Sequence, residues 1–190
     1  SVEPEAIIEQ LNSLVASGHQ EIVLTGIHIG QYGKDLYNPL SLLDLIKRIE
    51  PQLQGARLRL GSLEPTELPP ELLSHIVNSS QICPHYHIPL QAGTDRVLQA
   101  MNRNYSTQFF ADLIHDIRKQ QPLAGIGIDL IVGFPGESDE EFEETYRFIR
   151  SLPVSYLHVF PYSRRPGTPA ANLSGQIHGD IARLRAARMR

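Results

Sequence analysis

Two histidines, His85 and His87, stand two residues apart in a short run of strand-forming residues. On an extended strand such residues point to the same side, which is the spacing of a two-histidine metal site when carboxylates are near. His28, Glu64 and Asp129 lie at or near the ends of other predicted strands and would complete the ligand set. Histidine also packs as a partly buried hydrogen-bonding residue, and that structural role is the stronger interpretation.

The segment Gly133–Glu137 reads GFPGE and joins an apolar run to a predicted helix. Backbone N–H groups at such a helix start can cradle an anion or the edge of a ring. The same glycines also suit an ordinary turn that requires positive φ, and the sequence favours neither interpretation. The acidic residues Asp139–Glu141, Glu143 and Glu144 follow, and we interpret them as a solvated helix face placed well against the helix dipole.

Two further side chains carry weaker chemical signals. Cys83 resembles the nucleophile of a thiol enzyme, since histidines are near in sequence. It precedes Pro84 at the entry end of a predicted strand, so a structural cysteine is the stronger interpretation. Arg103, in the link between two predicted helices, is suited to pair with a carboxylate or a phosphate.

Composition narrows the class of protein. The 190 residues, 41% hydrophobic and 20% charged, suit one compact globular domain. No apolar run approaches the roughly 18 residues of a membrane span, and the N-terminus lacks the layout of a signal peptide, so we expect a cytoplasmic protein. The single cysteine excludes any metal site built from several thiolates of this chain. The net charge of −4 carries no signature of nucleic-acid binding.

Strand-like and helix-like patterns alternate along the chain, since apolar residues recur at helical spacing between short strand-like apolar runs. The predicted strands are Glu21–Thr25, Arg57–Leu60, His85–Ile88, Gly127–Phe134 and Tyr156–Phe160. The predicted helices are Ile7–Val15, Leu40–Ile49 opened by Asn38 and Pro39, Pro70–Val77, Asp95–Met101, Phe109–Gln120, a helix capped by Ser138 that runs to Arg150, and Gly179 to the end. The alternation predicts an α/β fold with a parallel sheet.

Glycine-rich and polar segments follow the strands rather than precede them. They are Gly26–His28, Gly61–Pro65, Pro89–Gly93, Gly133–Glu137 and Pro161–Ser163. In parallel α/β folds, ligands bind at the carboxyl ends of the strands. The first strand has no GxGxxG turn after it, which weakens a dinucleotide-binding interpretation. We therefore expect a binding site built from these five segments.

Both ends of the chain resemble cut edges of a larger domain. The chain starts on a helix with no strand before it, and it stops at an arginine-rich helix for which we predict no further partner. The sheet edge beside Glu21–Thr25 would then lie open, and open edges pair with other strands. The sequence therefore predicts dimerisation or aggregation through this edge.

Five ordered phrases resemble the radical S-adenosylmethionine methylthiotransferases. They are EIVLTGIHIGQYG (21–33), RLRLGSLEP (57–65), CPHYHIPLQAGTDRVLQAMNRNYS (83–106), GIDLIVGFPGESDEEFEETYRFI (127–149) and SYLHVFPYSRRPGTPAA (155–171). TGIHIG and HVFPYSRRPGTPAA are most similar to the branch that modifies threonylcarbamoyl-adenosine next to the tRNA anticodon. Branches that modify isopentenyl-adenosine in tRNA or a ribosomal protein are the alternatives.

The resemblance implies a partial (β/α) radical barrel of about five parallel strands. The family also has an N-terminal cluster domain, a CxxxCxxC loop that holds a 4Fe-4S cluster, and a C-terminal RNA-binding domain. This sequence departs from that pattern, because it has one cysteine and lacks the loop. We therefore expect residues 1–190 to be a single fragment of the core domain, lacking both flanking domains and inactive alone.

The resemblance also implies which residues contact S-adenosylmethionine. The turn after the first strand would contact its methionine end, and other strand ends would bind its carboxylate, ribose and adenine. This implied set is Thr25, Gly26, Ile27, Ser62, Glu64, Gln91, Gly93, Arg103, Asp129, Val132, Gly133 and Phe134. His28, Tyr162, Arg164 and Arg165 would contact the substrate tRNA, with the last three projecting from the rim.

Two hypotheses from other classes compete with this interpretation. The first is a metal-dependent hydrolase on a (β/α) barrel that uses His28, His85, His87 and Asp129. It predicts zinc or manganese bound to the purified chain. The second is a non-catalytic RNA-binding or scaffold piece, which predicts neither metal nor adenosyl-ligand binding.

Overall fold

The computed structural model describes residues 1–190 as two compact units, and each unit is described by itself. Unit 1 comprises Ser1–His87 with Gln120–Ala124, and unit 2 comprises Ile88–Lys119 with Gly125–Arg190. The assignment of the whole chain to one fragment of a core domain stays a prediction. None of the helices combines the length and the apolar character that a membrane span requires.

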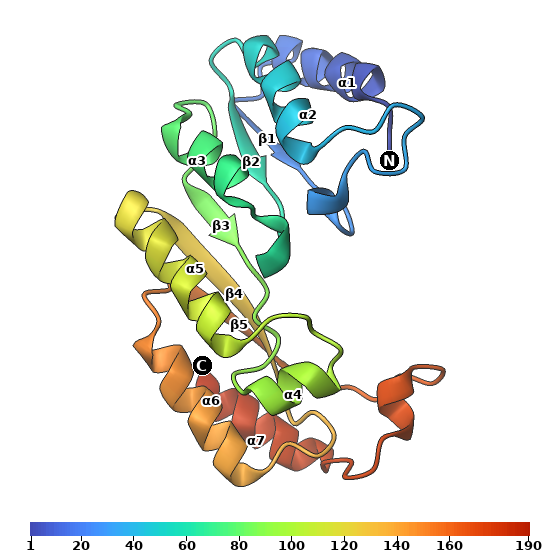
Figure 1. Cartoon of the computed structure of the whole chain (residues 1–190), viewed down its shortest axis with the longest axis vertical. Helices are drawn as coiled ribbons and strands as arrows, with labels where there is room; N and C mark the ends of the chain where they lie inside the picture. Colours follow the sequence, from blue (N-terminus) through green and yellow to red (C-terminus); the bar gives the residue numbers. More distant parts are fainter. The chain divides into compact units, whose positions relative to one another are not determined.

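Unit 1 alternates three helices with three strands (Figure 1). In chain order they are α1 Pro4–Ala16, β1 Glu21–Leu24, α2 Leu42–Ile49, β2 Arg57–Leu60, α3 Pro70–Asn78 and β3 His85–His87. β1 and β2 pair in parallel, with Glu21 opposite Arg57 and Leu24 opposite Leu60. Leu58 of β2 also forms a parallel bridge to Ile82, just before β3. β1 is an edge strand of its two-stranded sheet.

Helix α2 anchors the core of unit 1. Leu45, Ile46 and Ile49 are fully buried, because their spacing places them on one face of the helix. The predicted start at Asn38 and Pro39 is wrong: Ser41 caps the helix, its side chain accepting from the Asp44 N–H while the Asp44 carboxylate accepts from the Ser41 N–H. This reciprocal pair satisfies two free N–H groups, so it overrides the proline signal.

Unit 2 continues the alternation. Its elements are α4 Asp95–Ala100, α5 Thr107–Gln120, β4 Gly125–Val132, α6 Asp139–Ser151, β5 Tyr156–Pro161 and α7 Gly179–Met189. β4 and β5 pair in parallel from Gly127 opposite Tyr156 to Val132 opposite Pro161. The segment before α4 extends along the other edge of β4, where the Leu90 and Gln91 N–H groups both donate to the Asp129 carbonyl.

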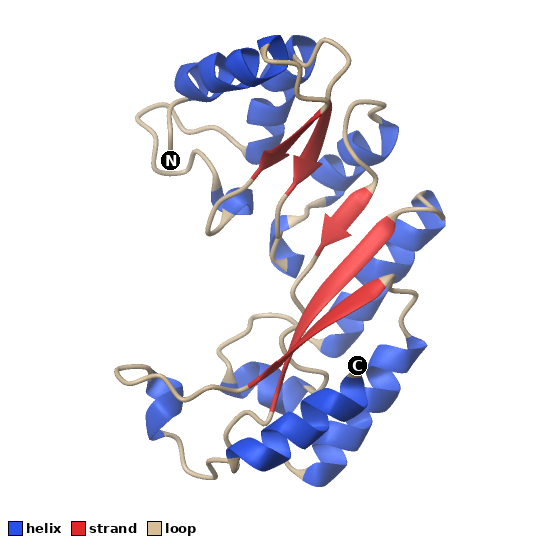
Figure 2. Cartoon of the chain, turned by 180° about the vertical axis from the view of Figure 1, so that it is seen from behind, coloured by secondary structure: helices blue, strands red, loops and turns tan.

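The two faces of the β4–β5 pair differ in burial. Ile126, Ile128, Leu130 and Val132 are fully buried on the side that packs against helices. Partners in a parallel register share a face, so Gly127, Asp129 and Ile131 lie on the opposite side with their β5 partners. Figure 2 shows this second side, which α5 leaves uncovered.

The α/β class, the five strands and their parallel pairing within each unit are confirmed. Element ends differ from the predictions by a few residues. For example, β4 spans Gly125–Val132, whereas the predicted strand was Gly127–Phe134. Four short 3-10 helices, at Ile29–Gln31, Glu50–Gln52, Pro65–Glu67 and Pro169–Asn172, were not predicted, because single turns carry no periodicity.

Candidate functional site

In unit 1, the carboxyl ends of β1 and β2 bring together two of the predicted segments. The Gly61 N–H donates to the Leu24 carbonyl at 2.8 Å. A Cβ at Gly61 would lie 3.2 Å from both that carbonyl and the Thr25 hydroxyl, so the two chains approach closely here. Ile27 is 96% exposed, which leaves the turn after β1 open to a ligand.

Ser62 and Glu64 follow β2 in the same region. The Ser62 hydroxyl lies 3.4 Å from the His87 Nδ1, and the Leu63 N–H donates to the His87 carbonyl. Glu64 stands directly before the short helix Pro65–Glu67. Thr25, Ser62 and Glu64 therefore give this end of unit 1 the hydroxyls and carboxylate that an amino acid or a ribose requires.

A buried carboxylate lies beside these segments, and the sequence did not predict it. The Glu67 side chain is 6% exposed, accepts from the Gln31 side chain at 2.9 Å, and lies 3.6 Å from the His28 Nδ1. A Cβ on Gly30 would meet Glu67 at 2.3 Å, so a glycine is needed there. His28 itself is 55% exposed, so the ring beside this buried carboxylate remains accessible.

A cavity of about 720 Å³ runs between α1 and β1 and reaches the turn after β1. Its walls are largely aliphatic, while Thr25, Gly26 and His28 line the end near the turn. The main aliphatic lining residues are Ile7, Leu11, Leu14, Ile22, Leu24 and Leu58. The edge strand β1 therefore forms part of the wall of this apolar cavity.

In unit 2, Gln91 adopts a left-handed backbone conformation with φ of 70°. Side chains other than glycine rarely adopt this conformation, which costs roughly 1–3 kcal/mol. Its N–H donates to the Asp129 carbonyl, and its carbonyl accepts from the Ile131 N–H, so the ladder with β4 holds it there. The backbone hydrogen bonds to β4 therefore hold Gln91 in a costly conformation at the position where the sequence predicts a ligand contact.

Gly93 and Arg103 have different surroundings. A Cβ on Gly93 would lie 2.7–2.9 Å from Thr145 of α6, so Gly93 permits close packing of that helix. Arg103 lies between α4 and α5, as predicted, and its N–H donates to the Leu98 carbonyl. On β4, the Asp129 carboxylate lies 3.1 Å from the Nδ1 of His158.

The GFPGE turn is closed by its own contacts. Gly133 has φ of 76°, and its N–H donates to the Glu137 carboxylate at 2.6 Å, while the Gly136 N–H donates to the Gly175 carbonyl. Both N–H groups therefore have partners within the protein, which favours the ordinary-turn interpretation of GFPGE. Val132 and Phe134 are buried, so a contact of this turn with adenine would have to use main-chain atoms.

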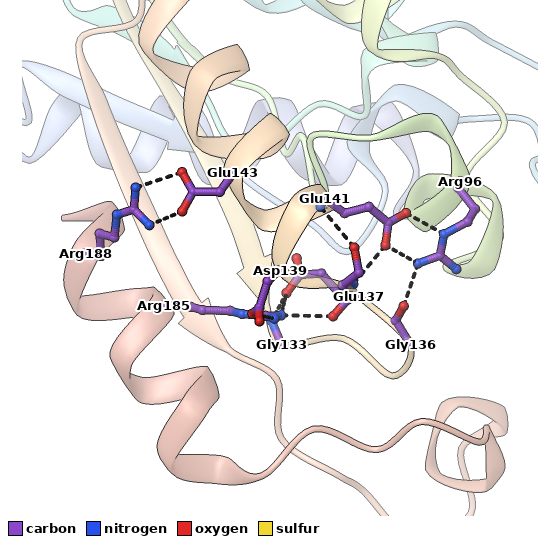
Figure 3. Close-up of polar contacts among 10 residues, drawn as sticks. Arg96, Gly133, Gly136, Glu137, Asp139, Glu141, Glu143, Arg185 and Arg188 are labelled. Atoms are coloured by element: carbon purple, nitrogen blue, oxygen red, sulfur yellow. Dashed lines mark hydrogen bonds and ion pairs between the residues drawn. The ribbon is translucent and has the colours of Figure 1, made fainter.

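Glu137 is held by the last helix. Arg185 of α7 donates to its carboxylate at 2.6 Å and to its carbonyl at 3.1 Å, and both side chains are buried (Figure 3). Burial raises the pKa of Glu137 above its usual value, and the Gly133 N–H and the Arg185 cation oppose that shift. A Cβ on Gly133 would also lie 2.6 Å from the Cβ of Ala182, so α7 packs directly on this turn.

Two predictions about charged residues are corrected by these contacts. Arg188 binds the Glu143 carboxylate with two nitrogens, and Arg185 also binds Asp139, so α7 has partners along its length (Figure 3). Arg96 of α4 donates twice to Glu141. Asp139, Glu141 and Glu143 of the acidic run therefore bind arginines and do not form a purely solvated face. Sequence spacing does not reveal these pairs, because the arginines come from other helices.

The residues after β5 divide into two groups. Arg164 and Arg165 are exposed, as a contact with RNA requires. Tyr162 does not project from the rim: its ring packs edge-on against Phe134 at 5.5 Å in the core cluster of unit 2, and its hydroxyl is buried. Burying the aromatic ring against Phe134 is more favourable in free energy than exposing it to solvent.

Cys83 and His85 of unit 1 have the surroundings of structural residues. Cys83 is buried and donates to Glu21 at 3.3 Å, and burial raises the pKa of its thiol, which confirms the structural interpretation. One buried thiol does not fit a 4Fe-4S cluster. Burial and the nearby Arg59 lower the pKa of His85, and within unit 1 no group of three ligands includes it.

Comparison with known proteins gives the family. The Radical SAM superfamily profile matches residues 1–149. The chain belongs to this superfamily. Among curated relatives, it is 42% identical over its whole length to a threonylcarbamoyladenosine tRNA methylthiotransferase of Bacillus subtilis, covering 42% of that protein. It is 36% identical over 189 residues to a tRNA-2-methylthio-N(6)-dimethylallyladenosine synthase of Desulforamulus reducens, covering 41% of that protein.

Solved structures show the same fold. The chain matches coproporphyrinogen III oxidase of Escherichia coli, a radical SAM enzyme, with a TM-score of 0.71 and 18% identity over 97% of this chain and 44% of that one. It matches the radical S-adenosylmethionine methyltransferase of Kitasatospora setae, with a TM-score of 0.71 and 14% identity over 89% of this chain and 30% of that one. The radical SAM fold that the resemblance implied is confirmed, and the chain spans less than half the length of these relatives.

Radical SAM proteins use S-adenosylmethionine and a 4Fe-4S cluster, and the residues of this chain fit only the first. Hydroxyl, carboxylate and amide groups at the strand ends suit the amino, carboxylate and ribose groups of S-adenosylmethionine. In unit 1 these groups come from Thr25, Ser62 and Glu64, and in unit 2 from Gln91 and Asp129. Their roles in binding the cofactor stay predictions.

Proposed function

We propose that this chain is the core of an enzyme that methylthiolates threonylcarbamoyl-adenosine next to the anticodon of tRNA. The 42% identity over all 190 residues to a threonylcarbamoyladenosine tRNA methylthiotransferase carries the proposal. The identity to dimethylallyladenosine synthases is lower, at 36–37%. A dimethylallyl-adenosine substrate is therefore the second candidate.

The side chains of the chain suit the first substrate. A threonylcarbamoyl group bears a carboxylate and a hydroxyl, which need polar partners, whereas a dimethylallyl group needs only an apolar pocket. His28 is accessible and lies 3.6 Å from the buried Glu67 carboxylate. We assign His28 to the polar end of the modified base, and the exposed Arg164 and Arg165 to tRNA phosphates.

The cofactor half of the proposal assigns roles to other strand ends. Thr25, Gly26 and Ile27 contact the methionine end of S-adenosylmethionine, and Ser62, Glu64 and Gln91 bind its carboxylate or ribose. When bound, S-adenosylmethionine would supply an adenosyl radical after accepting an electron from the cluster, and a second molecule of it would supply the methyl group. The cluster ligands must come from outside this chain, because it contains one cysteine.

A nucleoside assay of the full-length protein tests the proposal. The reconstituted enzyme is incubated with tRNA that carries either threonylcarbamoyl-adenosine or dimethylallyl-adenosine, and the digested nucleosides are measured by mass spectrometry. We expect methylthiolation of the first tRNA only, and no product from residues 1–190 alone. Product on the second tRNA only would favour the second candidate, and zinc or manganese bound with no adenosyl-ligand binding would favour the hydrolase.

Two further properties belong to the proposal. We expect the enzyme to act in the cytoplasm, where its tRNA substrate is found. We also expect residues 1–190 alone to associate through the edge of β1, where Val23 is 53% exposed beside the apolar cavity.

A further inference from the structure

Three aromatic side chains form a row on the uncovered face of unit 2. Tyr156, His158 and Phe160 alternate along β5 and therefore point to one side of the strand. Their ring centroids lie 5.3 Å and 6.4 Å apart along the row. We call these three residues the aromatic row.

The outer part of the aromatic row is accessible. Phe160 is 51% exposed, and the His158 side chain is also 51% exposed. By contrast, Phe110 and Phe142 on the helices of the same unit are buried. Exposing aromatic surface to water costs free energy, and contiguous exposed aromatic side chains are typical of binding surfaces.

Contacts with β4 hold the row in place. Gly127 lies beneath Tyr156, and a Cβ there would lie 1.9 Å and 2.2 Å from two carbons of the tyrosine ring, so the glycine makes room for it. The Asp129 carboxylate binds the His158 Nδ1 at 3.1 Å and so fixes the orientation of that ring. Rings that are fixed before a ligand arrives lose little conformational entropy when it binds.

We propose that the aromatic row is a stacking surface for an unpaired base of the substrate RNA. Aromatic side chains on a strand stack on single-stranded bases, because every base offers a flat π-face. The exposed Arg164 and Arg165 follow the same strand within a few residues and offer charges to the RNA backbone. An aromatic surface continued by arginines matches a single-stranded nucleic acid. This inference rests on the proposed function, since it assumes that the substrate is RNA.

Fluorescence binding by the full-length protein tests the proposal. The probe is an anticodon stem-loop in which 2-aminopurine replaces the adenine to be modified, because stacking quenches its fluorescence. We expect quenching by the unaltered protein. Phe160→Ala is expected to weaken RNA binding by about 5- to 150-fold and to abolish the quenching, as for the loss of one stacked base.

Two variants control for folding and for general loss of aromatic surface. Phe109→Ala removes a ring that is 44% exposed on α5, away from the row, and we expect unchanged RNA affinity. Phe160→Leu keeps apolar bulk but no π-face, so it should fold as the unaltered protein does and still lose the quenching. Phe160→Tyr should retain both affinity and quenching.

The outcomes separate this inference from the function on which it rests. If the unaltered protein binds RNA and Phe160→Ala binds it with the same affinity, only the proposed role of the aromatic row is overturned. The proposed role of the aromatic row is also overturned if Phe160→Ala weakens binding of S-adenosylmethionine and leaves RNA binding unchanged. A complete absence of RNA binding by the unaltered protein would overturn the proposed function and this inference together.

Discussion

At the scale of single residues, Gln91 combines backbone strain with a place at a strand end. Its left-handed conformation is one that glycine adopts without cost. We predict that Gln91→Gly raises the free energy of unfolding by up to about 1 kcal/mol and weakens binding of S-adenosylmethionine by the full-length protein. Thermal unfolding and a calorimetric titration measure the two effects.

Gln54 offers a matched control, because it is exposed and also has a positive φ, of 48°. Gln54→Gly should stabilise the protein in the same way and leave cofactor binding unchanged. Unaltered binding by Gln91→Gly would show that the strained residue has only a structural role.

At the scale of elements, the start of α6 depends on Glu141. Hydrogen bonds from Arg96 and the Ser138 N–H lower the pKa of this carboxyl. A group whose pKa is lowered by folding contributes stability above its unfolded pKa and loses it as the pH falls through the folded value. We predict that Arg96→Met lowers the free energy of unfolding by up to about 1 kcal/mol at pH 7. Near pH 3 the loss should be much smaller.

Urea unfolding of both proteins across this pH range measures the difference. The variant should lose less stability on acidification than the unaltered protein does. An equal difference at every pH would mean that Arg96 stabilises α4 and α6 by packing alone.

The packing of helix α7 depends on the buried ion pair between Arg185 and Glu137. Removing one partner of a buried ion pair leaves the other charge without compensation. We predict that Arg185→Met lowers the free energy of unfolding by about 3 kcal/mol, measured by urea unfolding at pH 7. Arg183→Met is the control, because Arg183 is 69% exposed, and its loss should cost well under about 1 kcal/mol.

The double variant Arg185→Met with Glu137→Gln tests the cause. It should recover part of the lost stability, because no buried charge is then left without a partner. If the double variant is as unstable as Arg185→Met, the arginine acts through its contact with the Phe142 ring instead.

At the scale of the whole molecule, the open edge of β1 governs association. Charged residues in the middle of an edge strand oppose pairing with another strand. We predict that residues 1–190 form dimers or larger species at high concentration and that Val23→Lys shifts them to monomers. Sedimentation of the two proteins tests this, and a strictly monomeric profile of the unaltered chain would contradict it.

Much of the fold was predictable because it depends on local chain properties. Alternating strand and helix patterns predicted five strands and their parallel class, and Ser138 with Glu141 predicted the start of α6. The start of α2 was less predictable, because Ser41 and Asn38 both offer plausible caps and only one forms the reciprocal pair with Asp44.

The sequence by itself determined the fold class, the family resemblance and the absence of cluster ligands, since each depends on residue types in order. Only the tertiary structure showed that Glu137 and Arg185 form a buried pair, that Tyr162 faces the core, and that His28 has Glu67 beside it. Each of these contacts joins residues whose encounter depends on how separate elements pack. Local sequence patterns do not encode that packing, so these contacts could not be predicted from the sequence.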